Sequence, residues 1–247
     1  MFYCLVTMIT EDYQHPATYV STGNPAVDFQ YSVEVFEADL SSYLPEDKET
    51  PILDVGCGWG QFLWWLREKE YTNIQGIDIG KAQAAHGNSI GLDIICVEDS
   101  TSFLENADSK YELIVMNHII EHMPAAEGIK ILKAIYKALR PNGRVVVQTP
   151  NLCAIGANHG RYIEISHVTG YTESSLHQIV TLAGFTNIEL FGSKTAFRLA
   201  PRRLILILLQ LISRAIWRIM LLAEWGTDAP KIIQRNLYAT AIKPPQQ

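Results

Sequence analysis

Hydrophobic and polar residues predict strands and helices in turn along the first two thirds of the chain. Short apolar runs predict the strands, and stretches with apolar residues three or four positions apart predict the helices between them. The predicted strands span 51–55, 73–79, 92–99, 111–117 and 144–150, and the helices span 61–70, 81–91 and 126–143. Strands that alternate with helices favour right-handed crossovers and a parallel sheet covered on both faces. We therefore predict a doubly wound α/β fold, with its ligand at the carboxyl ends of the strands.

The remaining segments extend this sheet. Residues 186–192 and 236–244 predict two further strands, which would complete a seven-stranded, mostly parallel sheet of the Rossmann-like kind. Before the sheet, the spacing of Phe29, Phe36 and Leu40 predicts a helix. The predicted organisation is an N-terminal helical lid or extension at 1–45, an α/β core at 46–200, a helical insertion at 201–235, and the last strand with a tail at 236–247.

Amino-acid composition limits the partners, the cysteine chemistry and the cellular compartment that we expect for this chain. The 247 residues carry a formal net charge of −6, so we expect no nucleic-acid partner. The four cysteines are scattered without a CxxC pair, which argues against a disulfide framework and against a thiolate zinc site. This pattern favours a reducing, cytoplasmic compartment. The first residues include an apolar run with no basic region before it, so we predict no signal peptide.

The residues after the predicted strands form one constellation. They are the run D-x-G-x-G-x-G from Asp54 to Gly60, then Asp78, then Glu98, Asp99 and Ser100, then Asn117 and His118. Glycines allow the backbone to turn tightly and to approach a ligand. A carboxylate such as that of Asp78 can accept hydrogen bonds from both hydroxyls of a ribose. The constellation therefore predicts a nucleoside-containing cofactor.

Two cofactors remain as alternatives. The dinucleotide fingerprint G-x-G-x-x-G would need a glycine at position 61, where this chain has Gln61. The leading acid, Asp54, is unfavourable beside a pyrophosphate but suits a cationic ligand, such as an amino-acid moiety next to a sulfonium. The residues thus favour such a ligand over a nicotinamide cofactor, which stays open as the weaker alternative.

Four segments strengthen this interpretation because they resemble motifs of class I S-adenosylmethionine-dependent methyltransferases. They are "ILDVGCGWGQFLWWL", "GIDI", "YELIVMNHIIEHM" and "LRPNGRVVVQTPN", which together span about 52–151 in the expected order. The resemblance implies that the glycines pack against the amino-acid part of S-adenosylmethionine, that Asp54 organises the loop and that Asp78 holds the ribose. Asp99 would face the adenine amino group, although Glu98 stands where the family often has a small residue. The cofactor site implied in this way comprises Asp54, Gly56, Cys57, Gly58, Gly60, Gln61, Asp78, Ile79, Asp99, Ser100, Asn117 and His118.

Histidines are the candidate catalytic residues, because a hydroxyl acceptor must lose a proton when it is methylated. We select His122 and His167. The alternative for His167 is that it only holds a loop before a helix capped by Thr172, and the alternative for His122 is a structural or cofactor-orienting role. His118 and His122 lie four apart, which also suggests a metal pair. No third ligand is evident nearby, so we predict no metal.

The most apolar stretch, residues 201–225, predicts a helix that starts at Pro201 and stops at Gly226. Arg214 and Arg218 interrupt its apolar run, so we do not expect it to span a membrane. Together with Arg203 and Gln210 these arginines form one arc, with leucines and isoleucines opposite. Two alternatives stay open: a helix lying in a membrane interface, or a helix packed on the domain or in a homodimer.

We expect an S-adenosylmethionine-dependent O-methyltransferase that acts on a small molecule or a glycan, with a lipid-linked acceptor as one option. The chain resembles methyltransferases of bacterial polysaccharide or natural-product assembly. Tyr13 and Tyr19 are candidate substrate contacts. The expected location is the cytoplasm, either free or peripheral on the inner face of the membrane. The alternatives are a non-catalytic module with this fold, for cofactor binding or membrane docking, and a nicotinamide-dependent oxidoreductase.

Overall fold

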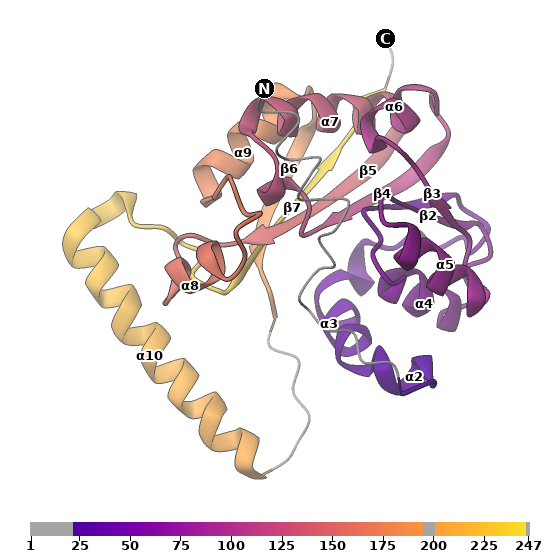
Figure 1. Ribbon diagram of the computed structural model, residues 1–247. Coiled ribbons are helices and arrows are strands. Elements are labelled where there is room, and N and C mark those ends of the chain that lie inside the picture. Colours follow the sequence, from indigo (N-terminus) through magenta and orange to yellow (C-terminus); the bar gives the residue numbers. More distant parts are fainter. Residues whose placement is uncertain (1–21, 195–200, 246–247) are drawn as a thin grey trace.

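A seven-stranded sheet forms the centre of the molecule in the computed structural model, which describes residues 22–194 and 201–245 (Figure 1). Tyr13 and Tyr19 lie outside these residues. The strands are β1 Ile52–Val55, β2 Ile74–Asp78, β3 Ile94–Cys96, β4 Tyr111–Asn117, β5 Leu139–Pro150, β6 Thr186–Gly192 and β7 Asn236–Ile242. Their order in the sheet is β3-β2-β1-β4-β5-β7-β6.

Strand directions confirm the predicted fold class. β1 pairs in parallel with β2 and β4, β2 with β3, and β4 with β5. β7 is antiparallel to both β5 and β6. The chain order reverses between β1 and β4, so the crevice for a ligand lies at the carboxyl ends of these two strands.

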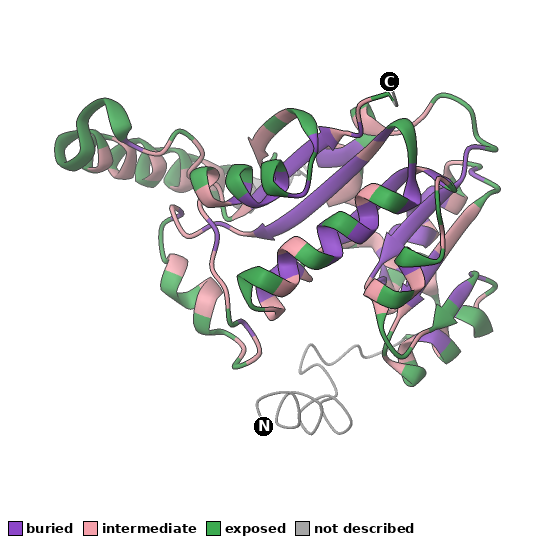
Figure 2. Ribbon diagram, turned by 90° about the horizontal axis from the view of Figure 1, so that it is seen from above, coloured by how far each residue is buried: buried purple, intermediate pink, exposed green. Residues whose placement is uncertain are grey.

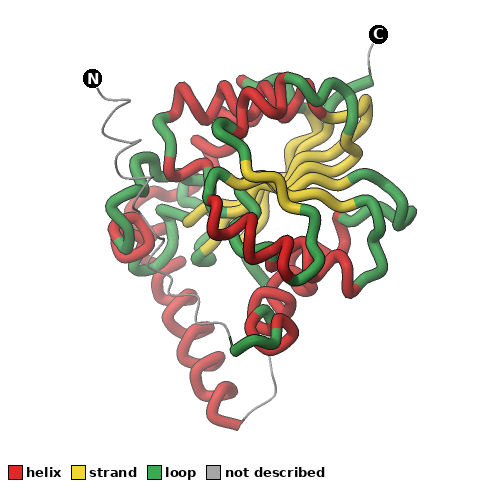
Figure 3. Tube along the Cα trace, turned by 45° about the vertical axis from the view of Figure 1, so that its right-hand side comes forward, coloured by secondary structure: helices red, strands yellow, loops and turns green. Residues whose placement is uncertain are grey.

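Helices cover both faces of the sheet (Figure 3). The α-helices are α2 Pro25–Asp28, α3 Gln30–Leu40, α4 Gln61–Glu68, α5 Lys81–Ser89, α6 Ser100–Glu105, α7 Ala125–Ala138, α8 Ala157–Tyr162, α9 Glu173–Leu182 and α10 Pro201–Trp225. Three short 3₁₀ turns are η1 Ser41–Tyr43, η2 Ile120–His122 and η3 Gly226–Asp228.

Side-chain alternation along the central strands builds a separate core on each face. Val145 and Val147 lie in a cluster with residues of α7 and α9, whereas Val146 lies in a cluster with residues of α3 and α4. Successive residues of a strand point to opposite faces, and both faces of this strand are buried. This explains why the strands are almost continuously apolar in sequence.

Several elements differ from the sequence prediction, which did not include the short helices α2 and α8. Helix α6 was not predicted, since its six residues are mostly polar and carry no helical periodicity. β5 begins at Leu139 rather than at residue 144, because Pro141 disfavours further helix and Leu139 pairs with Tyr111 of β4. Helix α6 is short, and β5 begins near a proline, so the sequence pattern is weak at both places.

The predicted N-terminal helix forms as α3 and packs against α4. Phe36 meets the rings of Phe62 and Trp65 edge-on or tilted, with ring centroids 5.3 and 5.8 Å away. The Glu37 carboxylate accepts a hydrogen bond from the indole nitrogen of Trp65 at 3.1 Å. In the described residues, this helix therefore acts as part of the layer over one face of the sheet.

Helix α10 lies between β6 and β7 in the chain and projects from the body of the molecule (Figure 1). Its half-buried positions form one stripe, which is pink among the green of Figure 2: residues 207, 210, 214, 217, 218 and 221. Two contacts direct this stripe toward the body. Trp217 Nε1 donates to the Cys153 carbonyl at 2.9 Å, and the Arg218 guanidinium donates to the Pro230 carbonyl.

The outward side of α10 is apolar. Its exposed large side chains are Leu204, Ile205, Leu206, Leu208, Leu209, Leu211, Ile212, Ile216, Ile219, Met220, Leu222 and Trp225. Within the described residues, the segment Leu204–Asp228 is long and apolar enough to cross a membrane by length and composition, with none of its most apolar window buried. Gln210, Arg214 and Arg218 of the polar arc thus lie on the side toward the protein, and the apolar arc faces outward.

Candidate active site

The loop after β1 takes a conformation that only glycine adopts easily. Gly56 has φ of +69° and Gly58 has φ of +52°. A Cβ on Gly56 would lie 2.2 Å from Cδ1 of Ile119, so this position excludes any side chain. A Cβ on Gly58 would meet only Gln61 Oε1, at 4.0 Å, among the described atoms. The backbone at Gly58 is therefore open to a ligand, as the glycine pattern predicts.

Two buried oxygens mark the switch point between β1 and β4. Asp54 is 2% exposed, and within the described residues its Oδ1 has no hydrogen-bond partner. The same holds for Oδ1 of Asn117 at the end of β4. Burial, together with a smaller contribution from the nearby Asp78 carboxylate, raises the pKa of the Asp54 carboxyl to about 8. Unpaired buried oxygens are costly, so this end of the sheet fits a ligand that supplies hydrogen-bond donors and positive charge.

Asp78 lies at the end of β2 and holds the glycine loop. Its Oδ2 accepts from the backbone N–H of Gly58 at 2.8 Å, and its Oδ1 accepts from that of Gly80 at 2.7 Å. Each carboxylate oxygen can accept a second hydrogen bond, so ribose hydroxyls can still bind there. Ile79 follows with 54% of its surface exposed. A contact between this side chain and the cofactor stays a prediction.

Asp99 caps helix α6. Its carboxylate accepts from the backbone N–H of Thr101 and from both the backbone N–H and the hydroxyl of Ser102. Burial opposes ionisation, but these hydrogen bonds outweigh it and lower the pKa of the Asp99 carboxyl. Ser100 is the first residue of the helix. A contact between Asp99 and adenine stays a prediction, and a capping signal at Asp99 could have revealed α6 in the sequence.

Cys57 belongs to the predicted cofactor set, but its side chain points away from the loop's open side. Its side chain is buried in a cluster with Leu63, Leu92 and Ile94, and burial, reinforced by nearby carboxylates, raises the pKa of its thiol. Only the backbone of Cys57 can therefore contact a ligand. Gln61 begins α4 directly after the loop, and its side chain is half-buried.

His118 and Glu121 form an ion pair at the end of β4. His118 has φ of +55°, and its Nδ1 lies 3.0 Å from Oε1 of Glu121. Glu121 is 2% exposed, and its Oε2 has no hydrogen-bond partner in the described part of the chain. Burial alone would raise the pKa of the Glu121 carboxyl, but the hydrogen bond and charge of His118 outweigh burial and lower it. Sequence reasoning missed Glu121, although the His-x-x-Glu spacing of "HIIE" places both side chains on one helical turn.

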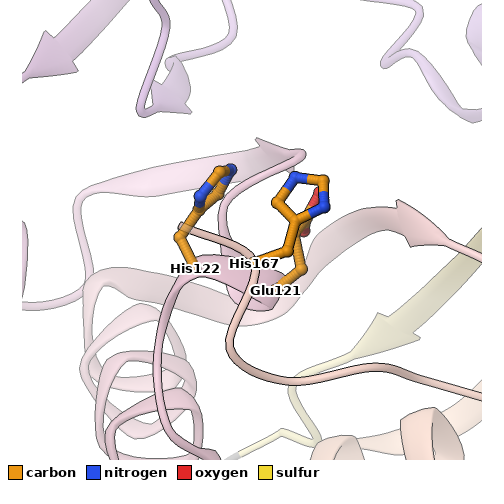
Figure 4. Close-up of side chains that lie close together, drawn as sticks. All are labelled: Glu121, His122 and His167. Carbon is orange, nitrogen blue, oxygen red and sulfur yellow. The ribbon is translucent and has the colours of Figure 1, made fainter. Parts of the chain in front are cut away.

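The structure brings the two predicted catalytic histidines together. The ring centroids of His122 and His167 lie 4.7 Å apart, in an edge-to-face arrangement, beside Glu121 (Figure 4). His122 Nδ1 lies 3.1 Å from the Ser166 hydroxyl, which in turn donates to Glu164 Oε2 at 3.2 Å. His167 is 8% exposed, and its Nδ1 lies 3.0 Å from the Gly160 carbonyl. Both rings are thus held at their Nδ1 atoms.

Backbone hydrogen bonds join the two segments that carry these histidines. The N–H groups of Val168 and Thr169 both donate to the Glu121 carbonyl, at 2.9 and 3.0 Å. The Thr169 hydroxyl donates to the Met123 carbonyl at 2.7 Å. After this joint, Thr172 caps α9 in a reciprocal capping box with Ser175, as the sequence predicts. The contact of His167 Nδ1 with the Gly160 carbonyl also agrees with a loop-holding role, so the choice between this role and catalysis stays a prediction.

Comparisons with known proteins identify related chains. Residues 30–190 match the family model described as a methyltransferase domain. The chain is 24% identical over 187 residues to a carboxy-S-adenosyl-L-methionine synthase from Actinobacillus pleuropneumoniae, covering 60% of this chain and 76% of that protein. It is 26% identical over 133 residues to a ubiquinone biosynthesis O-methyltransferase from Idiomarina loihiensis, which covers 51% of this chain and 53% of that protein. The chain thus spans about half the length of the second relative.

A solved structure shows the same fold. It is that of an S-adenosylmethionine-dependent methyltransferase from Archaeoglobus fulgidus, with a TM-score of 0.63 and 19% sequence identity, covering 88% of this chain and 97% of that chain. The family match covers more than half of the chain and decides between the two cofactors. The open glycine loop and the buried oxygens of Asp54 and Asn117 agree with a cationic cofactor. The chain therefore belongs to the methyltransferase-domain family, and it is a class I methyltransferase that uses S-adenosylmethionine.

Proposed function

We propose that this methyltransferase acts on a hydroxyl oxygen of a small molecule or a glycan. The proposal rests on His122 and His167. A hydroxyl acceptor has to lose a proton, and these two histidine rings lie together in loops that follow β4 and β5, where one of them could take it. A backbone carbonyl only accepts hydrogen bonds, so the Gly160 carbonyl keeps the proton of neutral His167 on Nδ1. The lone pair of that ring then lies on Nε2, which is the atom that can take the acceptor's proton.

The remaining site residues bind and orient. S-Adenosylmethionine, when bound, supplies an electrophilic methyl group on a sulfonium. Asp54 and Asn117 would hold its charged amino-acid part, since both have buried oxygens without partners among the described residues. Asp78 would hold the ribose while it keeps the glycine loop against β2. The acceptor would then approach from the side of His122 and His167, which lie beyond Asn117 in the chain.

Calorimetry and mass spectrometry together test this proposal. The folded protein should bind S-adenosylmethionine, Asp78→Ala should weaken binding at least tenfold, and Asp108→Ala, a surface control, should not. Incubation with labelled cofactor and a panel of hydroxylated small molecules, sugar nucleotides and lipid-linked glycans should yield a methylated hydroxyl. His167→Gln should keep cofactor affinity and lose turnover. Label found only on nitrogen or carbon would contradict O-methylation, and full turnover by His167→Gln would contradict the role of His167 as the base.

We also propose that α10 lies on a lipid bilayer and brings the enzyme to a lipid-linked acceptor. Its outward side presents a dozen exposed large apolar side chains, with only Ser213 polar among its exposed residues between Leu204 and Ala223. Patches of this kind on a soluble protein mark interaction surfaces. The opposite stripe carries Trp217 and Arg218, which are already bound to the body.

Sheet topology favours a helix on the surface over one that spans. β6 and β7 flank α10 in the chain and are paired neighbours in one sheet, with Gly192 opposite Leu237. A single crossing would leave the two ends of α10 on opposite sides of the bilayer. One connecting segment would then have to return through the lipid without regular hydrogen bonds, which is strongly unfavourable.

Liposome flotation tests the membrane proposal. Changing Ile212, Ile216 and Ile219 together to serine should abolish flotation. Leu182→Ser, which removes an equally exposed leucine on α9, should leave it unchanged. Equal flotation of all forms would contradict lipid docking. A dimer in light scattering that the triple serine variant dissociates would assign α10 to a second copy of the chain instead.

A further inference from the structure

Glu121, His122 and His167 form a cluster with the composition of a metal site. Each offers one ligand atom, and within the described residues these atoms all lie within 4.8 Å of one another (Figure 4). We propose that these three side chains bind a divalent metal ion that holds the acceptor hydroxyl. The binding of the ion stands on this geometry alone, whereas its part in catalysis rests on the proposed O-methylation.

An unpartnered buried oxygen points to a ligand at this place. Glu121 is 2% exposed, and its Oε1 pairs with Nδ1 of His118 at 3.0 Å. Its Oε2 has no hydrogen-bond partner among the residues that the structure describes. A buried carboxylate oxygen without a partner is unfavourable unless a donor or a cation is bound. A metal ion would remove that penalty.

The neighbours of the two histidines suit coordination through Nε2. Metal-binding histidines usually donate their other ring N–H to a carboxylate, a carbonyl or another acceptor, which orients the ring. His167 Nδ1 has the Gly160 carbonyl as its partner at 3.0 Å. His122 Nδ1 has the Ser166 hydroxyl, which passes the contact on to the Glu164 carboxylate. We therefore assign Nε2 of both rings and Oε2 of Glu121 as the metal ligands.

Ligand type and number indicate which ions fit. Two imidazoles and one carboxylate suit zinc, manganese, iron or cobalt better than calcium, which prefers oxygen ligands. Metal bonds of about 2.0 to 2.2 Å place neighbouring ligand atoms roughly 3 to 3.5 Å apart, so the side chains would draw slightly inward. Three protein ligands leave positions open for water or substrate, as in catalytic sites.

The open positions give the ion its role. A hydroxyl bound to a divalent ion loses its proton more readily, and the proton passes to bulk water. The acceptor oxygen then forms a bond to the methyl carbon as the carbon–sulfur bond breaks, and the electron pair of that bond stays on sulfur. Under this proposal His122 and His167 act as ligands, and direct proton transfer to His167 Nε2 is not needed.

Cobalt titration of the full chain tests metal binding without any acceptor. After treatment with a chelator, the wild-type protein should bind one Co²⁺ per chain and show visible d–d absorption. Glu121→Gln, His122→Gln and His167→Gln should each weaken binding at least tenfold, and Ser166→Ala should weaken it about tenfold through the His122 ring. His177→Gln, which changes an exposed histidine on α9, is the matched control and should bind like the wild type.

Each outcome decides a separate question. Absent Co²⁺ absorption in wild-type protein, or unchanged binding in both histidine variants, would overturn the metal site. Cofactor binding, measured by calorimetry, shows that each variant is folded. Metal binding without methylated hydroxyls would keep the site and contradict the proposed function. Methylation that survives the chelator but is lost in His167→Gln would overturn the metal's role and support His167 as the base.

Discussion

The cofactor side and the acceptor side of this active site are built in different ways. The cofactor side lies at the ends of neighbouring parallel strands, where the Gly58 N–H of the loop after β1 donates to Asp78 at the end of β2. The acceptor side combines η2 with residues 160–169, two segments about 45 positions apart that backbone hydrogen bonds join. The first side therefore depends on the pairing of parallel strands, and the second on contacts between two distant loop segments. Ile119 is where they meet, because its side chain fills the space beside Gly56.

Gly56→Ala should have the largest effect, because it disturbs both sides at once. The new Cβ would meet Ile119 Cδ1 at 2.2 Å, and φ of +69° disfavours any side chain. We expect a loss of about 3 to 5 kcal/mol in the free energy of unfolding, the combined cost of strain and overpacking. Denaturant unfolding measures it.

The companion variants separate the two causes. Gly56→Ala combined with Ile119→Ala should relieve the clash and leave only the backbone strain. Gly58→Ala, with strain but no clash among the described atoms, should cost about 1 kcal/mol. Equal losses for Gly56→Ala and Gly58→Ala would show that the two sides are not coupled through Ile119.

Asp54→Asn tests the cofactor side alone. Burial raises the pKa of the Asp54 carboxyl from 3.8 to about 8 in the free protein, so the neutral acid is favoured in the fold. Its contribution to stability is complete below about pH 4 and is lost as the pH rises through 8. Asp54→Asn should remove this part of the pH dependence, an effect on the order of 4 kcal/mol between pH 5 and pH 9.

The same variant should bind the cofactor more weakly, because a cationic ligand favours the ionised carboxylate. Wild-type protein should therefore release protons when S-adenosylmethionine binds near pH 7, and Asp54→Asn should release fewer. Calorimetry in buffers of different ionisation enthalpy measures this difference. Identical proton release in both proteins would place the cationic part of the cofactor elsewhere.

Thr169→Val tests the acceptor side and should have the smallest effect on stability. It removes the hydrogen bond from Thr169 to the Met123 carbonyl at 2.7 Å, worth about 1 kcal/mol, and keeps the shape of the side chain. We expect unchanged affinity for S-adenosylmethionine and a lower rate of methyl transfer, because the position of His167 depends on this joint. A rate that falls only in proportion to a loss of cofactor affinity would contradict the separation of the two sides.

The sequence predicted which strand-end residues lie close together, and it predicted the contacts of the acceptor side only in part. Asp54, Asp78 and Asn117 lie at or near the carboxyl ends of parallel strands, and these strands end at one edge, so their meeting follows from the chain order. Glu121 was missed because nothing local distinguishes a buried, unpaired carboxylate from an exposed one. Cys57 was included with the loop, although its side chain turns into the core. The contact of His122 with His167 depends on how a long loop returns to the sheet.

Helix α10 also has some features that follow from the sequence and others that depend on the tertiary structure. Its length, its limits at Pro201 and Trp225, and its apolar character follow from the sequence, because propensity, proline and glycine act locally. The direction of its two arcs does not, since it depends on which side chains find partners on the body. Trp217 and Arg218 find carbonyl oxygens there, so the polar arc turns inward and the leucines face out. Local periodicity thus determines the elements and the strand-end motifs of this protein, whereas pairings between distant segments decide which side chains share a site.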